Sequence, residues 1–191
     1  DARTPDYAIY LSRRKIIVEI KEISPNPEEL KAQRLARLGQ FVVVSSTPGD
    51  RVRSKISKAV PQLKAATKGR FPGLLVLLNR CLVAEHTSSY NIRVAMHGFE
   101  TYYLGVPQNP SQLVYLKHKD FGSGKRTTPS NNTSLSAIAV LSPHDTSPTM
   151  RIYHNPHAKV SLPLASFGKY GVKQYGLQPK SQGQVPDWQE V

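Results

Sequence analysis

The chain of 191 residues is long enough for one sizeable hydrophobic core, at the usual ~100–200 residues per domain. Hydrophobic residues make up 39% of it and charged residues 20%, which is typical of a folded globular protein and excludes a disordered one. The 26 Lys and Arg outnumber the 13 Asp and Glu, so the formal net charge is +13 and we expect a polyanion, nucleic acid first of all, as the partner.

Membrane and disulfide-stabilised classes are disfavoured. No stretch approaches the ~20 consecutive apolar residues of a membrane span and no signal peptide is visible, so we expect a soluble intracellular protein, cytoplasmic or nuclear. The single cysteine, Cys81, excludes a disulfide framework or a thiolate zinc site within one chain. Its apolar neighbours indicate a small buried side chain.

The N-terminal region predicts a β-hairpin followed by a helix. Residues 7–11 (YAIYL) and 15–23 (KIIVEIKEI) are rich in β-branched and aromatic types and are joined by a short polar stretch. A helix is predicted over 27–38, because Asn26 can cap it, proline suits its first turn and Gly39 stops it.

The next elements complete a sheet. The residues FVVVSS at 41–46 predict a buried strand. Asp50 is a plausible cap for a helix over 51–67. Within that helix, Pro61 predicts a kink or a division into two short helices. The continuous apolar run LLVLL at 74–78 is typical of a central strand covered on both faces. This order of strands and helices predicts an α/β (α+β) fold with a mixed central β-sheet flanked by helices.

Residues 81–177 are expected to continue the domain begun by residues 1–80. A helix is predicted over 88–98, and additional C-terminal strands are predicted at 101–106, 113–119, 135–142 and 150–154. The Gly- and Ser-rich stretch 121–134, with Lys125 and Arg126, is either a mobile loop or a loop that grips nucleic acid. Residues 178–191 are expected to be a weakly ordered tail with a possible anchor at Trp188.

Basic residues are concentrated in the middle of the chain. No acidic residue lies between Arg51 and Ala84. The basic residues of this stretch are Arg51, Arg53, Lys55, Lys58, Lys64, Lys68, Arg70 and Arg80. The stretch predicts a basic surface element, and the alternative is a solubilising face without a specific ligand.

The first two predicted strands bring acidic and basic side chains together. Because side chains alternate along a strand, Glu19 and Lys21 share one face with Ile17, while the opposite face of the same strand is wholly apolar and is expected to form the core. If the apolar faces of both strands coincide, Asp6 projects on the side of Glu19 and Lys21. A two-residue connection places Asp6 opposite Glu19, and a four-residue connection places it opposite Lys21.

Two carboxylates and an ammonium group in one place suit phosphodiester hydrolysis. Carboxylate oxygens are the hard ligands that Mg²⁺ prefers, and a neighbouring lysine can stabilise charge on the phosphate or orient the attacking water. The alternative is an ordinary cross-strand ion pair on a half-exposed hairpin.

Pro5-Asp6 followed by Glu19-Ile20-Lys21 resembles the signature of the PD-(D/E)xK nuclease superfamily. The resemblance covers residues 5 to about 78 and implies a restriction-endonuclease-like core within residues 1–80. It implies that Asp6, Glu19 and the backbone carbonyl of Ile20 bind Mg²⁺ or Mn²⁺, while Lys21 acts catalytically. Many members also place a Gln or Lys on the helix after the third strand, and Gln62 is the residue we expect in that role.

The resemblance implies a metal-dependent endonuclease acting on DNA, and by analogy a homodimer. Members commonly carry an acidic residue on a helix before the Pro-Asp strand, so we expect its role to be absent here or filled otherwise, since only residues 1–4 precede Pro5. Nucleic-acid contacts are expected from Arg51, Arg53, Lys55, Lys58, Lys125 and Arg126. The alternatives are a non-catalytic nucleic-acid-binding module of the same fold in a larger assembly, and an RNA-binding or ribosome-associated protein.

Overall fold

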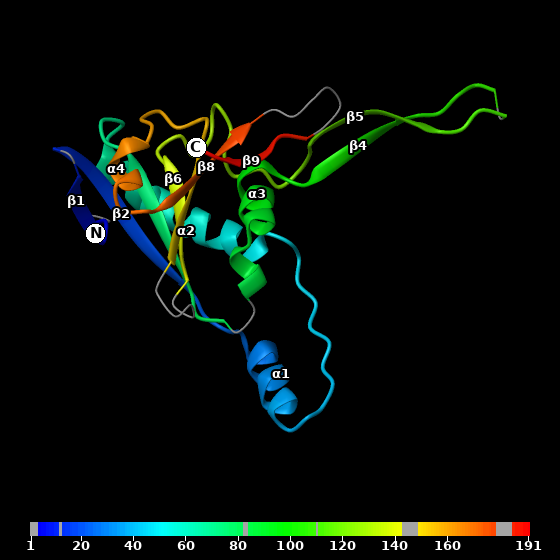
Figure 1. The fold of residues 1–191 in the computed structure, drawn as a ribbon, viewed down its shortest axis with the longest axis horizontal. Helices are drawn as coiled ribbons and strands as arrows, with labels where there is room; N and C mark the ends of the chain where they lie inside the picture. Colours follow the sequence, from blue (N-terminus) through cyan, green and yellow to red (C-terminus); the bar gives the residue numbers. More distant parts are fainter. Residues whose placement is uncertain (1–3, 12, 82–83, 110, 143–148, 179–184) are drawn as a thin grey trace.

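The computed structural model describes residues 4–11, 13–81, 84–109, 111–142, 149–178 and 185–191. They form a seven-stranded mixed sheet in the order β1-β2-β3-β6-β7-β8-β9 and a separate two-stranded sheet, β4-β5 (Figure 1). The expected fold class, a mixed central sheet flanked by helices and extended by C-terminal strands, is confirmed.

The N-terminal hairpin adopts the shorter of the two predicted registers. Strands β1 (Tyr7–Leu11) and β2 (Arg14–Ile23) are antiparallel, and Leu11 lies opposite Arg14. Arg13 has a φ of 64°, the left-handed conformation that two-residue hairpin connections require. The connection is therefore two residues long, which is the register that places Asp6 opposite Glu19.

The centre of the sheet is parallel. Strand β3 (Gly73–Asn79) pairs in parallel with β2 on one side and with β6 (Ala137–Ser142) on the other. Helix α2 (Asp50–Thr67) precedes β3 and covers one face, where Ile56 and Leu63 pack against Leu75 and Leu77. The predicted central strand at 74–78, covered on both faces, is confirmed.

Both faces of β2 are buried in its middle, which corrects the expectation of a single core face. Ile17 and Ile23, on the Glu19 side, pack under α2, and Glu19 itself has no exposed surface. On the other side Ile16 and Val18 join a second core, but Ile20 is 38% exposed. A helix that connects two parallel strands must cover one face of the sheet, and here it covers the face that bears the charged residues.

Helix α1 (Pro27–Arg37) begins as predicted, with the Asn26 side chain accepting a hydrogen bond from Glu29 N, and the Glu29 carboxylate accepting one from Asn26 N. It projects from the body of the molecule (Figure 1). The expectation of a strand at 41–46 is wrong. Phe41 is 97% exposed and the segment carries no strand, because both neighbours of β2 are already β1 and β3.

Helix α2 is one uninterrupted helix, so the division expected at Pro61 is wrong. The carbonyl deprived of its partner by Pro61 belongs to the exposed Ser57, where water can satisfy it. The expected cap at Asp50 is also wrong. Asp50 is the first helical residue, and Gly49, with a φ of 72°, occupies the cap position.

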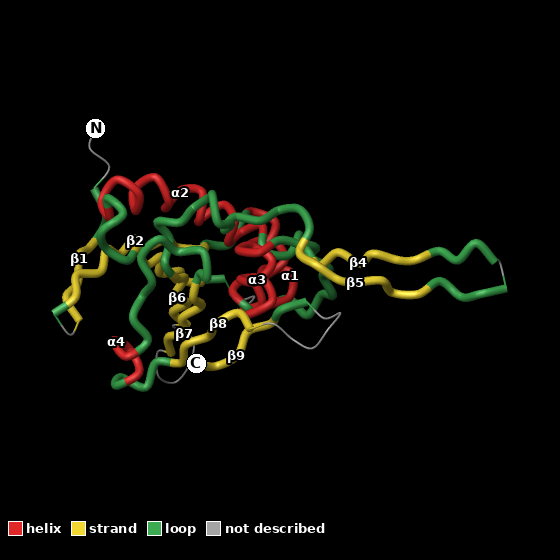
Figure 2. Tube along the Cα trace, turned by 90° about the horizontal axis from the view of Figure 1, so that it is seen from above, coloured by secondary structure: helices red, strands yellow, loops and turns green. Residues whose placement is uncertain are grey.

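Helix α3 (Ser89–His97) begins after the Ser88 cap, as predicted within 88–98. Strands β4 (Glu100–Gly105) and β5 (Tyr115–Phe121) form a hairpin that extends far from the body (Figure 2). Strand β7 (Thr149–His154) pairs with β6. The remaining short elements are the 3₁₀ helix η1 (Ala84–Thr87) and helix α4 (Ala165–Gly168).

The C-terminal segment is more regular than expected. Strand β8 (Lys173–Gln178), which the sequence did not indicate, adds to β7, and β9 (Asp187–Glu190) pairs with β8. The expectation of a weakly ordered tail is therefore wrong for residues 187–190, and residues 179–184 lie outside the described part of the chain. The anchor at Trp188 is confirmed, since its indole Nε1 donates to the carbonyl of Ser89 at 3.0 Å. Among the helices that the structure describes, none is long and apolar enough to cross a lipid bilayer.

Candidate functional site

The structure brings Asp6 and Glu19 together at the point where β1 begins. The backbone N–H of Asp6 donates to Glu19 Oε2 at 3.3 Å, and Asp6 Oδ2 accepts a hydrogen bond of 2.7 Å from the N–H of Ile20. The Asp6 side chain is exposed and Glu19 is buried, so the pair spans the boundary between solvent and core. Each carboxylate is thus bonded to a backbone N–H of the opposite strand.

Pro5 cannot donate a hydrogen bond to the β2 residue that it faces. The N–H and C=O of one strand residue point to the same side, so the carbonyl of Ile20 faces the β1 side, as its N–H does. Continuing the register beyond Tyr7, which lies opposite Val18, places Pro5 opposite Ile20. Proline has no N–H to donate. The Ile20 carbonyl therefore lies on the same side of β2 as its N–H, to which the Asp6 carboxylate is bonded.

Lys21 forms an ion pair with Glu19. Its ammonium group donates to Glu19 Oε1, and its side chain keeps 24% of its surface exposed. Both oxygens of the buried Glu19 carboxylate are therefore occupied, one by Lys21 and the other by the N–H of Asp6. A buried carboxylate requires such partners, because an unpaired charge in the core is strongly destabilising.

The flank of α2 places further basic groups near Lys21. The pKa of Lys55 is lowered by burial, and then by the charges of Lys58, Arg51 and Lys21, while Glu22 opposes this shift. Lys55 is thus within electrostatic reach of Lys21. Gln62 follows Lys55 by seven residues, about two helical turns, so it lies on the same flank of the helix and is half-buried.

Two of the expected nucleic-acid contacts have structural roles instead. Arg53 is 6% exposed, donates to the carbonyl of Pro48 at 2.9 Å and lies over the ring of Phe99. Arg51 bonds to the carbonyl of Ser24 and to the carboxylate of Glu29. The expectation of an exposed basic surface is wrong for Arg53, which is buried where the first turn of α2 packs, whereas the Arg51 side chain remains 26% exposed.

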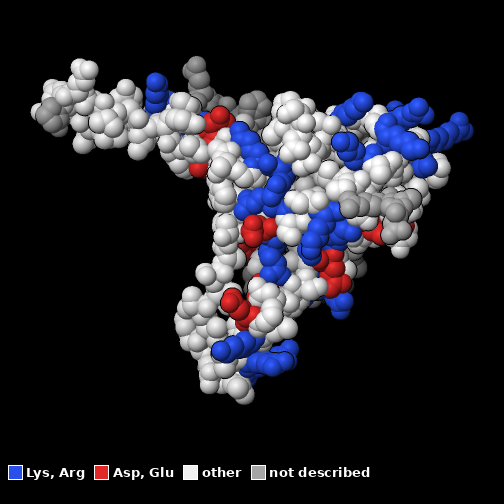
Figure 3. Space-filling view, turned by 180° about the vertical axis from the view of Figure 1, so that it is seen from behind, with Lys and Arg blue, Asp and Glu red and all other residues white. Residues whose placement is uncertain are grey.

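The other expected contacts are on the surface. Lys58, Lys125 and Arg126 are exposed, and Lys55 is half-buried. The 121–134 loop is anchored near its centre, where the backbone N–H groups of Arg126 and Thr127 both donate to the carbonyl of Met96. Figure 3 shows Lys and Arg side chains in several clusters over one face of the body, whereas the projecting hairpin carries few of them.

A second group of ionisable side chains was not indicated by the sequence. Glu29, Cys81 and His86 are buried, and their ligand atoms all lie within 4.8 Å of one another. The three residues are far apart in the chain. They meet because α1 follows β2 and η1 follows β3, and the carboxyl ends of these parallel strands are adjacent, with Ile23 opposite Asn79.

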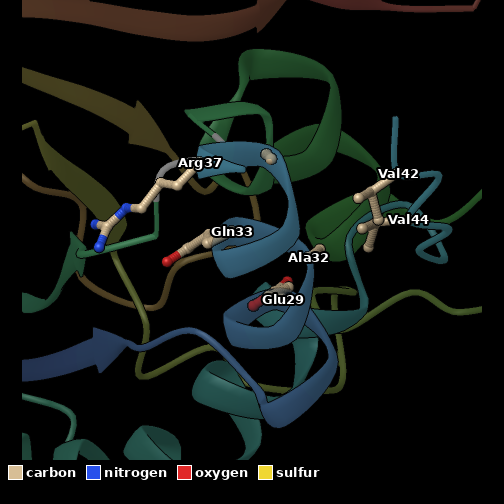
Figure 4. Close-up of a pocket in the computed structure, with 7 residues that line it drawn as sticks. Glu29, Ala32, Gln33, Arg37, Val42 and Val44 are labelled. Carbon is tan, nitrogen blue, oxygen red and sulfur yellow. The ribbon is translucent and has the colours of Figure 1, made fainter. Parts of the chain in front are cut away.

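A hollow beside this group is lined mainly by aliphatic side chains. This cavity of about 420 Å³ lies between α1 and the segment that follows it, where Val42 and Val44 lie on the same side of the helix as Ala32 (Figure 4). Glu29 is at its edge. Asp6, by contrast, is on the exposed surface, where a phosphodiester of a long polymer can approach it without entering a cavity.

No family model, no curated protein and no solved structure was found to match this chain.

Proposed function

We propose that the protein is a metal-dependent nuclease that hydrolyses phosphodiester bonds in DNA, with Asp6, Glu19 and Lys21 at its centre. The observation that carries the proposal is that Asp6 and Glu19 are neighbours at the start of β1, each bonded through its carboxylate to the opposite strand, with the Lys21 ammonium bonded to Glu19. These are the three residues in which the sequence resembles the PD-(D/E)xK signature.

The donor set fits a hard divalent cation. Two carboxylates and a backbone carbonyl offer oxygen atoms only, which Mg²⁺ and Mn²⁺ prefer. Asp6 and Glu19 would hold the ion together with the Ile20 carbonyl, and the bound ion would supply a polarised phosphate and an acidified water. To bind the ion, Glu19 would release the Lys21 ammonium group. The Lys21 side chain is partly exposed, so it can turn outward.

The protein's own residues then orient the reaction. Lys21, released from Glu19, donates to a nonbridging phosphate oxygen and stabilises the charge that develops on it. Lys55 and Lys58 hold the flanking phosphates, and Gln62 orients the attacking water by hydrogen bonding. The lowered pKa of Lys55 reflects, after burial, its crowding by like charges, which a phosphate would relieve.

The β4-β5 hairpin supports nucleic acid as the ligand. Residues 101–119 contain no acidic residue. The ring of Tyr103 stacks on His118 with centroids 4.1 Å apart, and the Lys119 ammonium lies 4.9 Å from the centre of the Tyr102 ring. Both tyrosines are about half exposed. Exposed aromatic rings interleaved with basic groups are suited to stacking on bases and pairing with phosphates.

The test is cleavage of plasmid, linear and branched DNA, and of RNA, with Mg²⁺, Mn²⁺ or a chelator. We expect metal-dependent DNA cleavage by the native chain and a loss of at least about 100-fold in Glu19→Gln and in Lys21→Met. Equal traces of activity in all three proteins would identify a contaminant and contradict the proposal. Size-exclusion chromatography with light scattering tests the homodimer that the resemblance implies.

The second candidate, a non-catalytic binding module, is favoured by the tight Glu19–Lys21 pair, which is also what a structural ion pair looks like. Salt-dependent DNA binding without cleavage under any metal condition would establish it. Preference for structured RNA over DNA in the same binding assay would favour the ribosome-associated alternative.

A further inference from the structure

The Glu29, Cys81 and His86 side chains converge from three separate elements. Glu29 comes from the first turn of α1, Cys81 from the residues after β3, and His86 from η1. His86 Nε2 and Glu29 Oε1 are 2.7 Å apart, and Cys81 Sγ and Glu29 Oε2 are 3.9 Å apart. All three residues are less than 8% exposed. Three metal-ligating side chains thus surround one buried point.

The donors are those of zinc rather than of magnesium. A thiolate, an imidazole nitrogen and a carboxylate oxygen form the mixed set that Zn²⁺ binds, whereas Mg²⁺ takes oxygen ligands. The expectation from the sequence that one cysteine excludes a thiolate zinc site considered only sites with several cysteines, and this mixed set needs one. In a tetrahedral zinc site, sulfur and nitrogen ligands are separated by about 3.5 Å. The present separations, up to 4.8 Å, require the side chains to close by about an ångström, which rotamer adjustment at such a site supplies.

The group is not arranged for nucleophilic catalysis. A nucleophilic cysteine needs a base within hydrogen-bonding distance and access to substrate. Here the carboxylate lies between the thiol and the imidazole, and Cys81 is 1% exposed. Burial and the Glu29 charge raise the pKa of the Cys81 thiol, which keeps it protonated and inert. A bound divalent ion would reverse that effect and deprotonate the thiol.

The Arg51 guanidinium supplies positive charge beside Glu29 and Cys81. Its guanidinium nitrogens lie 3.4 and 3.5 Å from the Glu29 oxygens and 3.8 Å from Cys81 Sγ. Burial raises the pKa of Glu29, but the bonds from Asn26 N and His86 and the Arg51 charge outweigh it and lower that pKa. The Arg51 side chain is 26% exposed, so it has an outward path by which to leave.

We propose that Glu29, Cys81 and His86 form a structural zinc site, in which the ion displaces the Arg51 guanidinium and fastens α1 to the body of the protein. Among the residues of α1, all of which the structure describes, Glu29 alone is buried, so this group is where the helix is attached. Figure 4 shows Glu29 on the first turn of the projecting helix. Binding releases the thiol proton of Cys81, while His86 binds through Nε2 as the neutral imidazole with its proton on Nδ1, and water completes the coordination.

The first test uses the native chain, because its single cysteine makes the result unambiguous. Cobalt(II) added to metal-free protein should give a thiolate-to-cobalt charge-transfer band and the visible spectrum of a tetrahedral ion. One equivalent of Zn²⁺ should abolish both signals, and excess Mg²⁺ should not. Absence of the charge-transfer band would overturn the proposal without any variant, because the band can arise only from Cys81.

Variants then identify the other ligands and the competitor. His86→Gln should weaken zinc binding by at least about 100-fold, whereas His118→Gln, on the projecting hairpin, should leave it unchanged. Arg51→Gln should tighten zinc binding, since it removes the competing cation. Equal zinc affinity in His86→Gln and the native chain would contradict the site, as would weaker binding in Arg51→Gln.

Hydrogen exchange tests the structural role separately from affinity. Zinc should slow exchange of the α1 amides by at least about tenfold in the native chain and leave those of β3 unchanged. Unchanged α1 exchange at saturating zinc would contradict the fastening of the helix. None of these measurements involves Asp6, Glu19 or DNA cleavage, so they stand or fall independently of the nuclease proposal.

Discussion

Asp6 and Ile20 are joined by a hydrogen bond of 2.7 Å between a side-chain carboxylate oxygen and a backbone N–H, across the end of the first hairpin. This bond directs one carboxylate oxygen of Asp6 at β2 and leaves the other for a ligand. Asp6→Asn removes the charge with little change of shape. We expect Mn²⁺ affinity to fall at least about tenfold and DNA cleavage at least about 100-fold.

Isothermal titration calorimetry with Mn²⁺ measures the first effect, and a plasmid-nicking assay measures the second. Asp120→Asn is the matched control, because Asp120 is also an exposed carboxylate and bonds to its own neighbour, Phe121 N. Identical metal binding in the two variants would count against Asp6 as a ligand.

Lys21→Met should destabilise the fold by roughly 1–3 kcal/mol, because the fully buried Glu19 carboxylate would lose its cationic partner. Lys21→Arg keeps the charge and should retain most of the stability. Urea denaturation followed by circular dichroism measures the free energy of unfolding. A Lys21→Met variant as stable as Lys21→Arg would show that the ion pair is not needed to bury Glu19.

Gly49→Ala should destabilise the protein by more than about 2 kcal/mol, since a Cβ at this position would lie 2.9 Å from Ala95 N and 3.0 Å from Asn91 O. Gly39→Ala is the control, because Gly39 has a similar φ of 74° but its Cβ would meet nothing within 4 Å. Thermal unfolding should therefore show a much smaller loss for Gly39→Ala. Equal losses would mean that backbone strain, not the contact between α2 and α3, determines the cost.

The pKa of His97 is lowered to about 4 by burial, assisted by the charges of His157, Arg93 and Lys125. Its ordinary value is 6.5, so the unfolded chain binds this proton more readily than the folded one. Stability therefore falls as the pH drops from 6.5 towards 4. Between pH 7 and pH 5 we expect a loss of about 2 kcal/mol from this residue. His97→Gln should flatten that part of the pH profile in urea titrations, and an unchanged slope would contradict this assignment.

Tyr103→Ala should weaken the binding of single-stranded DNA by about tenfold or more, because base–aromatic stacking contributes roughly 1–3 kcal/mol per base. Tyr170→Ala is the control, since Tyr170 is also a largely exposed tyrosine but lies near α4. Fluorescence anisotropy at two salt concentrations measures the affinities. Equal affinities for both variants would show that the hairpin is not a stacking surface.

Local patterns predicted the elements that depend on neighbours in the chain. The alternation of side chains in 15–23 placed Asp6 near Glu19 and Lys21 in either register, and the two-residue connection seen in the structure puts it opposite Glu19. Asn26, a strong capping residue three positions before Glu29, marked the start of α1 correctly. The apolar run at 74–78 identified the central strand, because only a strand covered on both faces tolerates continuous aliphatic residues.

Errors arose where a segment's neighbours in space decide its state. FVVVSS at 41–46 has the composition of a strand, but it pairs with no strand of either described sheet, so it stays irregular and mostly exposed. Arg53 lies in a basic run, yet its guanidinium is held against the Phe99 ring. Strand β9 has four residues, and its pairing with β8 rather than its own composition makes it a strand.

The amino-acid sequence by itself determined the hairpin and placed Asp6 near Glu19 and Lys21 in either of two registers, since strand alternation is a local property. Only the tertiary structure decided that α2 covers the Glu19 side of the sheet and that Glu29, Cys81 and His86 share one buried point. Those contacts join residues distant in the chain. Their proximity follows from the parallel pairing of β2 with β3, which no periodicity within either strand encodes.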